Sequence, residues 1–386
     1  MITVIEKARL ARWLCLVCAV FVMFFPSLTN AGEDRPLKEW QARNDLLELP
    51  AVKSEMATSS LLLDIARAGE RLVTVGERGH ILCSDDNGKS WQQADVPVML
   101  TLTAVDFPNP QKGWAVGHDG IVLHTEDGGD TWVKQFDAFE ANRMSLEYAQ
   151  QLVAAKTAEL DQAPEEAKSA LRKQLDDLKY ELEYWETAEE GCCVPLLDVW
   201  FKNSKEGFVI GAYGRFYKTS DGGRTWSPWW DKIDNPWKLH LNGFAYAAGS
   251  LFIARESGGL YRSPDDGASW ESLESPHDGS YLGIVASPKQ DLLIAYGIGA
   301  KLVYSKDGGA SWKLVQTKAG AALSGGTVKK DGSVLIVSYS GIILAGSDNP
   351  ETFVPKKIGA GWNALAETDD QHIVLVGLKG VHRSAF

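Results

Sequence analysis

The chain contains 386 residues, of which 45% are hydrophobic and 23% are charged, and its formal net charge is −12. These proportions are typical of a globular protein and argue against bulk disorder and against a polytopic membrane protein. The acidic balance also argues against a nucleic-acid partner, because a nucleic-acid binder needs a basic surface to neutralise phosphates.

The N-terminus has the pattern of a secretory signal peptide. Three basic residues among the first twelve precede an apolar run from Trp13 to Phe25, and small and polar residues follow up to Ala31. The run is too short to span a bilayer comfortably as an anchor. We therefore predict a signal peptide at 1–31, cleaved after Ala31, and an exported chain that is at most peripheral to the membrane. An uncleaved N-terminal anchor is the alternative.

One phrase recurs along the chain with the pattern Ser/Thr-x-Asp-x-Gly-x-Ser/Thr-Trp. Five copies are nearly complete, and a degenerate sixth surrounds Asp348. Successive central aspartates lie 41, 94, 44, 42 and 41 residues apart, so the unit is about 42 residues long and one interval contains an insertion. The central aspartates and closing tryptophans of the five copies are Asp86 and Trp91, Asp127 and Trp132, Asp221 and Trp226, Asp265 and Trp270, and Asp307 and Trp312.

Each unit combines this phrase with short alternating hydrophobic runs, such as 103–107, 113–117 and 121–124 in the second unit. Alternation with a period of two predicts strands. Repeats of about 40–45 residues with four strands each are typical of a β-propeller. We predict an all-β fold, a seven-bladed β-propeller over 60–386, with six blades as the alternative.

The last unit ends before its fourth strand. An unpaired sheet edge is a liability, so we predict that residues within 36–57, part of an N-terminal segment at 32–59, supply the missing strand and close the ring.

The residues of the repeated phrase suit a structural role. Aspartate and hydroxyl side chains can hydrogen bond to backbone N–H groups in a turn, glycine allows the left-handed conformation, and tryptophan buries a large ring between sheets. Equivalent turns of separate blades cannot bring their carboxylates to one substrate or metal ion. No metal, cofactor or catalytic residue is therefore expected, and the cysteines Cys83, Cys192 and Cys193 lack metal-ligand spacing.

The insertion, 137–190, has the composition of a helical hairpin. Leu171, Leu175, Leu178, Leu182 and Trp185 recur at helical spacing, and the charge of the segment sums to −8, six basic residues against fourteen acidic ones. The hairpin is either a solvated projection or a docking arm for a basic or apolar partner. As candidate partner-binding residues on it we select Leu171, Leu178 and Trp185.

The turns that join the second and third strands of each blade share one propeller face with the connections between blades. We therefore expect the hairpin to stand over these turns. The turn residues are either ordinary exposed residues or a recognition ring around the central channel. The candidate partner-binding residues among them are Glu77, Arg78, His118, Asp119, Tyr213, Glu256, Tyr339 and Lys379.

The repeated phrase is identified as the Asp-box, or BNR repeat, found in sialidases, sortilin-type ectodomains and the photosystem II stability/assembly factor family. The chain resembles the last of these most in its signal-bearing N-terminus, its repeat length and the phrase from Gly113 to Gly120. This resemblance implies a non-catalytic exported scaffold that binds a membrane-protein complex or its subunits. It also implies the thylakoid lumen in a photosynthetic host and the periplasm otherwise.

Two other functions stay open at this point. Relatives in non-photosynthetic bacteria make a periplasmic accessory of an RND-type exporter or envelope complex the first alternative. The second is a sialidase-like propeller that binds or hydrolyses glycans. The chain has no Arg-Ile-Pro phrase and few arginines in its propeller repeats, so we expect no enzyme activity.

Overall fold

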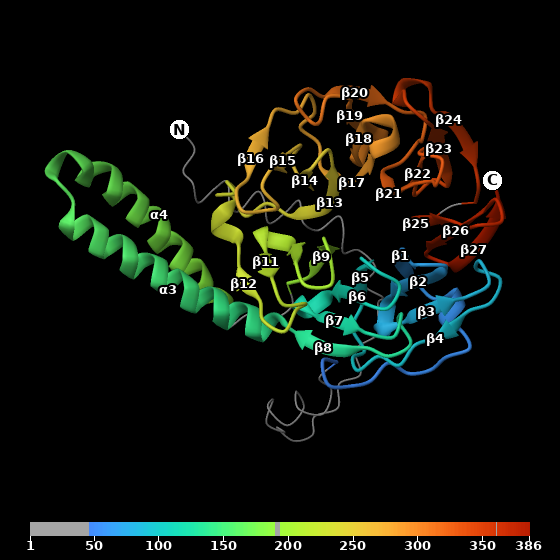
Figure 1. Cartoon of the computed structure of the whole chain (residues 1–386), viewed down its shortest axis with the longest axis horizontal. Coiled ribbons are helices and arrows are strands. Elements are labelled where there is room, and N and C mark those ends of the chain that lie inside the picture. Colours follow the sequence, from blue (N-terminus) through green and yellow to red (C-terminus); the bar gives the residue numbers. More distant parts are fainter. Residues whose placement is uncertain (1–45, 190–193, 360) are drawn as a thin grey trace, which may run out of the picture. The chain divides into compact units, whose positions relative to one another are not determined.

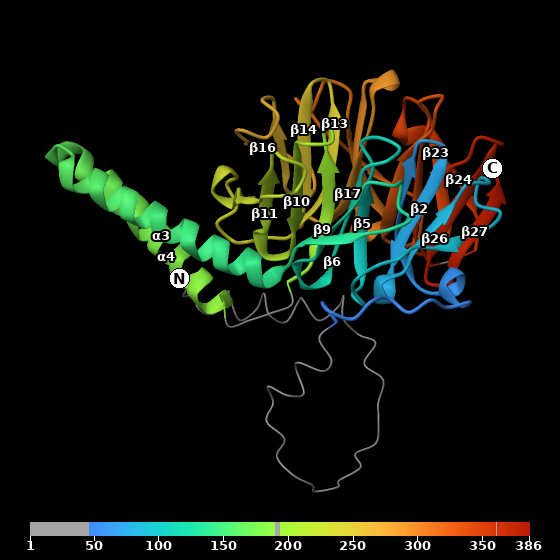
Figure 2. The same ribbon diagram turned by 60° about the horizontal axis from the view of Figure 1, so that its bottom comes forward.

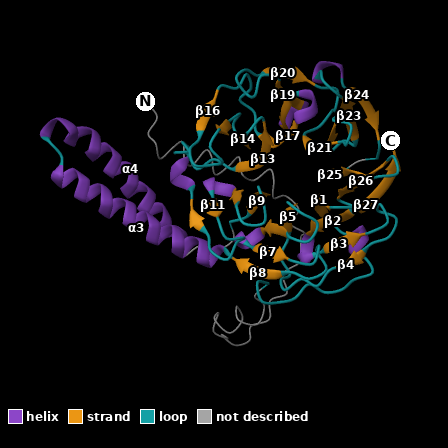
Figure 3. Cartoon of the chain, in the orientation of Figure 1, coloured by secondary structure: helices purple, strands orange, loops and turns teal. Residues whose placement is uncertain are grey.

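The computed structural model describes residues 46–189, 194–359 and 361–386. The predicted signal peptide, Cys192 and Cys193 lie outside the described residues. Seven antiparallel sheets follow one another along the chain, six with four strands and the last with three (Figures 1 and 3). A pair of helices, α3 (Ala138–Gln162) and α4 (Glu165–Glu189), separates the second sheet from the third. The predicted seven-bladed propeller with an inserted helical hairpin is confirmed.

The strands of each blade follow chain order from the innermost strand outward. In the first four blades they are β1 (Leu62–Ala68), β2 (Arg71–Gly76), β3 (Ile81–Ser84) and β4 (Gln92–Gln93); β5 (Leu102–Asp106), β6 (Gly113–Gly117), β7 (Val122–Thr125) and β8 (Val133–Phe136); β9 (Leu196–Phe201), β10 (Gly207–Gly211), β11 (Phe216–Thr219) and β12 (Ser227–Pro228); and β13 (Leu241–Ala247), β14 (Ser250–Arg255), β15 (Leu260–Ser263) and β16 (Glu271–Leu273). The others are β17 (Tyr281–Ser287), β18 (Leu292–Gly297), β19 (Lys301–Ser305) and β20 (Lys313–Gln316); β21 (Leu323–Val328), β22 (Val334–Ser338), β23 (Ile342–Gly346) and β24 (Val354–Lys357); and β25 (Trp362–Glu367), β26 (His372–Gly377) and β27 (Gly380–Ala385).

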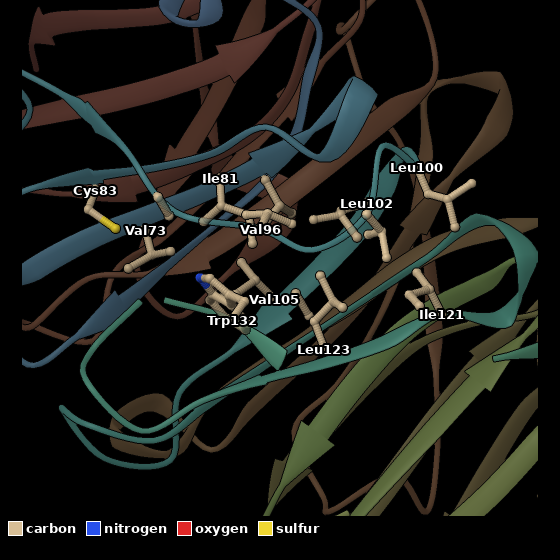
Figure 4. Close-up of a cluster of buried hydrophobic side chains, with 14 of the residues drawn as sticks. Val73, Ile81, Cys83, Val96, Leu100, Leu102, Val105, Ile121, Leu123 and Trp132 are labelled. Atoms are coloured by element: carbon tan, nitrogen blue, oxygen red, sulfur yellow. The ribbon is translucent and has the colours of Figure 1, made fainter. Parts of the chain in front are cut away.

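Hydrophobic side chains from facing sheets fill the space between neighbouring blades. Between the first two blades, side chains of β2 and β3 meet those of β5 and β7 (Figure 4). Trp132 is only 4% exposed there and contacts the ring of Phe107 edge to face at 6.0 Å. Cys83 is a buried free thiol in the same cluster, and burial raises its pKa to about 12. It therefore packs as a small hydrophobic residue.

The Asp-boxes form compact hydrogen-bonded turns. Asp127 accepts bonds from the Thr125 hydroxyl at 2.7 Å and from the N–H and hydroxyl of Thr131 at 3.0 and 2.6 Å. In other boxes, bonds from Ser269 and Ser311 lower the pKa of Asp265 and Asp307 to about 2. The box carboxylates therefore stay ionised and serve their own turns.

The described part of the N-terminal segment runs along the first blade. The Ala51 N–H donates to the Val96 carbonyl at 3.0 Å, and the Leu46 carbonyl accepts from Met99 N–H at 2.9 Å. Residues 46–57 thus bond to the connection between the first two blades and add no strand to β27. The rest of the segment predicted to close the ring, 36–45, lies outside the described residues, and closure by it stays a prediction.

The innermost strands close the ring through side chains. The innermost strand of each blade contacts that of the next, and β25 contacts β1. We call the junction between two neighbouring blades a seam. At four seams, a side chain of one innermost strand donates to a backbone carbonyl of the next innermost strand: Thr103 to Leu196 at 2.7 Å, Asn242 to Tyr281 at 2.6 Å, Ser324 to Trp362 at 2.7 Å, and Asn363 to Leu62 at 2.8 Å.

Carboxylates bridge seams from the other direction, by accepting backbone N–H groups. Asp64 accepts from Val105 at 2.9 Å, Asp106 from Phe201 at 2.7 Å, and Asp198 from Phe244 at 2.6 Å. Desolvation raises the pKa of all three, that of Asp106 to about 7. These bridges place acidic groups where the ionised form is penalised.

We expect Asp106→Asn to remove part of the pH dependence of folding. The unfolded carboxyl group ionises near 3.8, whereas the folded one holds its proton up to about pH 7. Raising the pH from 4 to 7 therefore lowers the free energy of unfolding of the wild type by about 2–4 kcal/mol through this group. Asparagine stays neutral and can still accept from Phe201. Urea unfolding at pH 4, 5.5 and 7 measures the difference, and a gap between the two proteins that does not change with pH would contradict the raised pKa.

Candidate protein-binding face and helical arm

The seven turns between the second and third strands of each blade lie on one face, which we call the turn face. In every blade, the N–H of the first turn residue donates to the carbonyl of the residue that immediately precedes the innermost strand. The seven bonds are Glu77 to Leu61, His118 to Thr101, Ala212 to Pro195, Glu256 to His240, Ile298 to Ser280, Tyr339 to Ala322 and Leu378 to Gly361, at 2.9 to 3.1 Å. The turns and the connections between blades are thus held together on a common face.

Backbone conformation fixes how these turns present their middle residues. Arg78, Asp119 and Tyr213 have φ values of 55°, 54° and 55°. This left-handed region is uncommon for residues other than glycine. Each of the three precedes a glycine that is itself left-handed and closely packed, so the turn is rigid before any partner arrives.

Two of the candidate residues support the turn itself. The carboxylate of Glu77 accepts the Leu61 N–H at 3.0 Å, and that of Glu256 accepts the His240 N–H at 2.7 Å. Both bonds join the turn to the strand entry of the same blade. These glutamates are half-buried, so their first role is to hold the turn face in shape.

Large apolar side chains are exposed in four of the seven turns. Tyr213 is 45% exposed, Ile298 44%, Tyr339 46% and Leu378 64%. Trp237, in the connection that enters β13, is 69% exposed. Arg78, His118 and Lys379 are exposed on the same set of turns, and Asp119 is half-buried. Aromatic residues among scattered charges are the composition found at protein interfaces.

The helical hairpin, which we call the arm, begins where the sequence predicts. Asp137 caps α3 by accepting the N–H groups of Phe139 and Glu140 at 3.1 and 3.2 Å. The arm then projects away from the ring (Figures 1 and 2). At its base, the start of α3 lies against the turn at His118–Gly120, where Gly120 closely approaches Ala138, and the rest of the arm extends outward. The expectation that the arm stands over the turns is therefore wrong.

The reason is an aromatic and ionic cluster that fixes the base of the arm to the third blade. The Trp185 ring lies under the Arg215 guanidinium at 4.3 Å and 5.8 Å from the Trp230 ring. Lys238 forms an ion pair with Glu181, and both side chains are largely buried. Burial lowers the pKa of Lys238 despite this partner.

Further contacts come from α3. The Ser145 hydroxyl is 3.1 Å from that of Tyr217, and the Tyr148 hydroxyl donates to Asp231 at 3.1 Å. Trp185 is only 1% exposed, so it anchors the arm and cannot touch a partner in this structure. Leu171 and Leu178 are half-buried on the side of α4 that carries Leu175.

Metal-ligating side chains are not clustered in the described parts of the chain. Among them, no group of three or more His, Cys, Asp or Glu side chains is placed to hold a metal ion. One cavity has Arg67, Lys329, Lys330 and Glu367 among its lining residues. Its charged groups are paired, Arg67 and Lys330 with Asp369 and Lys329 with Glu367. No helix in the described parts of the chain is long and apolar enough to cross a membrane.

The sequence model of the photosynthesis system II assembly factor YCF48 family matches residues 45–147 and 179–352. This chain belongs to that family. It is 30% identical to the photosystem II assembly lipoprotein Ycf48 of Synechococcus sp. (strain CC9902) over 296 residues, 75% of this chain and 74% of the relative. It is 24% identical to the chloroplastic photosystem II stability/assembly factor HCF136 of Arabidopsis thaliana over 310 residues, 73% of this chain and 72% of the relative.

Solved structures show the same fold. A structure of YCF48 bound to D1 peptide superimposes with a TM-score of 0.59 at 15% identity, covering 88% of this chain and 99% of that one. YCF48 from Cyanidioschyzon merolae gives a TM-score of 0.56 at 15% identity, covering 84% of this chain and 94% of that one. The family match leaves out residues 148–178, which form the outer part of the arm.

We expect Glu181→Gln to destabilise the arm. The substitution leaves the buried Lys238 ammonium without its ion-pair partner, which costs about 3–5 kcal/mol for a fully buried pair. Glu147→Gln is the matched control, because the pair of Glu147 with Arg143 is exposed and contributes about 0–1 kcal/mol. Chemical unfolding measures the stability of both variants, and hydrogen exchange in α4 reports whether the base of the arm opens. Equal effects of the two variants would contradict the anchoring role of Glu181.

Proposed function

We propose that this protein is a non-catalytic, exported assembly factor whose turn face binds an extended segment of a membrane-protein subunit. The observation that carries the proposal is the set of exposed apolar side chains, Tyr213, Ile298, Tyr339 and Leu378, in equivalent turns of a rigid ring. Family membership supports the role, since the relatives are named as photosystem II assembly factors. None of the named relatives is described as an enzyme.

The partner we propose is a photosystem II subunit or a protein of similar kind. A related protein is known in complex with a D1 peptide. A ring of turns with aromatic side chains suits a flexible peptide, because each turn offers a separate contact along an extended chain.

The proposed location is outside the cytoplasm, in the thylakoid lumen or the periplasm. The predicted signal peptide supports it, as do the lipoprotein name of one relative and the chloroplastic name of another. An exporter accessory would occupy the same compartment, whereas a glycan-binding propeller would need a polar pocket. No observation on the described residues favours either alternative.

A variant with Tyr213→Ser, Tyr339→Ser and Leu378→Ser tests the turn face. Loss of two aromatic contacts and one aliphatic contact should weaken binding of a D1 peptide by about tenfold or more. Fluorescence anisotropy with a labelled D1 peptide measures the affinity.

The matched control replaces three equally exposed apolar residues on outer strands, Val133, Leu314 and Val354, by serine. This control should bind the D1 peptide within about twofold of the wild type. If both variants lose the same affinity, the turn face is not the binding surface. Binding of a sialylated oligosaccharide at one to one stoichiometry would instead favour the glycan alternative.

A further inference from the structure

A small cavity lies between the base of the arm and the ring. Residues of the second blade, of α3, of β9 and of β11 line it, and its polar lining residues are Asn142, Arg215 and Tyr217. Its volume is about 10 Å³, which gives room for one group of the size of a water molecule. The rest of the lining is apolar, so the chemistry of the cavity depends on these three side chains.

Arg215 brings a buried positive charge to this cavity. It is only 3% exposed, and it is the most deeply buried lysine or arginine of the described residues. Its Nη1 donates to the Tyr217 hydroxyl at 3.5 Å, a long bond, and its Nε has no hydrogen-bond partner in the described parts of the chain. Other buried nitrogen atoms without a partner, such as Nε1 of Trp226, belong to neutral groups, for which burial costs less.

The neighbouring carboxylates are engaged with other cations. Glu181 forms an ion pair with Lys238, and Asp231 forms one with Lys232. No carboxylate oxygen of the described residues lies within 4.0 Å of the Arg215 guanidinium. Burial lowers the pKa of Lys238, and the nearby charge of Arg215 lowers it further. The base of the arm therefore has one more positive charge than its carboxylates balance.

We propose that this cavity binds a single small anion, chloride, between α3 and the third blade. A buried cation without a counterion is strongly unfavourable, so the charge favours an anion over a water molecule. The volume favours a monatomic ion, because acetate, sulfate and phosphate are larger than one water-sized group.

The lining supplies the donors that such an ion needs. The Nε–H of Arg215 is one of them. The Tyr217 hydroxyl is the other, since its bond to the Ala141 carbonyl is long at 3.5 Å and a hydroxyl can turn its hydrogen towards a better acceptor. The Trp185 ring, 4.3 Å from the guanidinium, stabilises the cation through its π face and adds no negative charge.

The bound anion completes the anchor of the arm. Ala138, Ala141 and Asn142 of α3 line the cavity together with Arg215 of the third blade. An ion between them neutralises Arg215 where Trp185 packs on it, so the closed base of the arm is stabilised over an open one. The proposal does not rest on the proposed function, because it concerns how the arm is held and not which partner the turn face binds.

The test measures hydrogen exchange of the mature protein in sodium chloride and in sodium gluconate at equal ionic strength, so that charge screening is the same. Exchange at the base of the arm, 138–149 and 181–188, should be about tenfold slower in saturating chloride, because a ligand that binds only the closed state suppresses opening. Equal exchange in the two salts would overturn the proposal. Acetate should act like gluconate, and protection by acetate equal to that by chloride would overturn the assignment to a monatomic ion.

Arg215→Met keeps a long side chain without its charge, and it should abolish the difference between chloride and gluconate. Arg255→Met is the matched control, because Arg255 is also half-buried over an aromatic ring, that of Tyr261 at 5.5 Å, but does not line the cavity. This control should keep the chloride effect within about twofold. An undiminished chloride effect in Arg215→Met would place the ion elsewhere and overturn the proposal.

Direct detection in the wild type covers the case in which Arg215→Met does not fold. Bromide can replace chloride and scatters X-rays anomalously, so crystals grown in sodium bromide should show an anomalous peak in the cavity beside Nε of Arg215. Crystals without this peak would overturn the proposal.

Glu190, which lies outside the described residues, provides a last control. Glu190→Gln should leave the chloride effect unchanged, because the proposed counterion of Arg215 is the bound anion. If the base of the arm loses its chloride effect and opens as readily in Glu190→Gln as in Arg215→Met, Glu190 is the counterion and the proposal fails.

Discussion

Neighbouring blades of this ring are joined by side chains, because their innermost strands belong to separate sheets and share no backbone ladder. Five seams use a hydroxyl or amide donor, such as Asn363, which reaches the Leu62 carbonyl at 2.8 Å where the last blade meets the first. At three of the seams, a carboxylate accepts a backbone N–H of the next blade. The flat turn face and the fixed base of the arm both depend on this closure, since each is built on blades that could otherwise move apart.

Aspartate has two opposite environments in the structure. In the boxes, hydroxyl and N–H donors surround a solvent-accessible carboxylate and lower its pKa, to about 2 for Asp307. In the seams, desolvation outweighs the bonds from two backbone N–H donors and raises the pKa, to about 7 for Asp106. The difference follows both from access to water and from the additional hydroxyl donors of the boxes. Box carboxylates therefore contribute stability as anions, whereas seam carboxylates are best accommodated when protonated.

The fold could be predicted well from the sequence because the same repeat occurs several times. Five near-complete boxes at an interval of about 42 residues define the blades, and the loss of glycine between Phe136 and Gly191 marks the hairpin. The seam residues Asp64 and Asp198 were missed because they occupy one position in only the first and third repeats, where the other blades have alanine or glycine. Only the three-dimensional closeness of successive strands gives such isolated residues a common role.

The site was predicted less completely. Spacing placed Trp185 on the inner stripe of α4, but a helical period does not reveal what that stripe packs against. The missing information lies in the connection from Trp229 to Lys238, whose tryptophans and lysine have no counterpart in the other repeats. The available signal was this aromatic-rich connection, which could have indicated the surface against which the inserted helices pack. The glutamates Glu77 and Glu256 also bond the strand entries of their own blades, a role that is invisible without the fold.

The family match divides the arm into a base that it includes and an outer part, 148–178, that it leaves out. It also includes the ring up to residue 352, and it leaves out the last blade. The anchoring cluster lies at this boundary: Glu181 and Trp185 are within the match and hold whatever extends beyond it. A projection can vary in length and surface without disturbing the blades as long as this base is kept, because no hydrogen bond or ion pair described beyond Tyr148 and before Tyr180 links it to the ring. The fold thus allows the surface of the outer arm to change while the propeller that supports the arm stays the same.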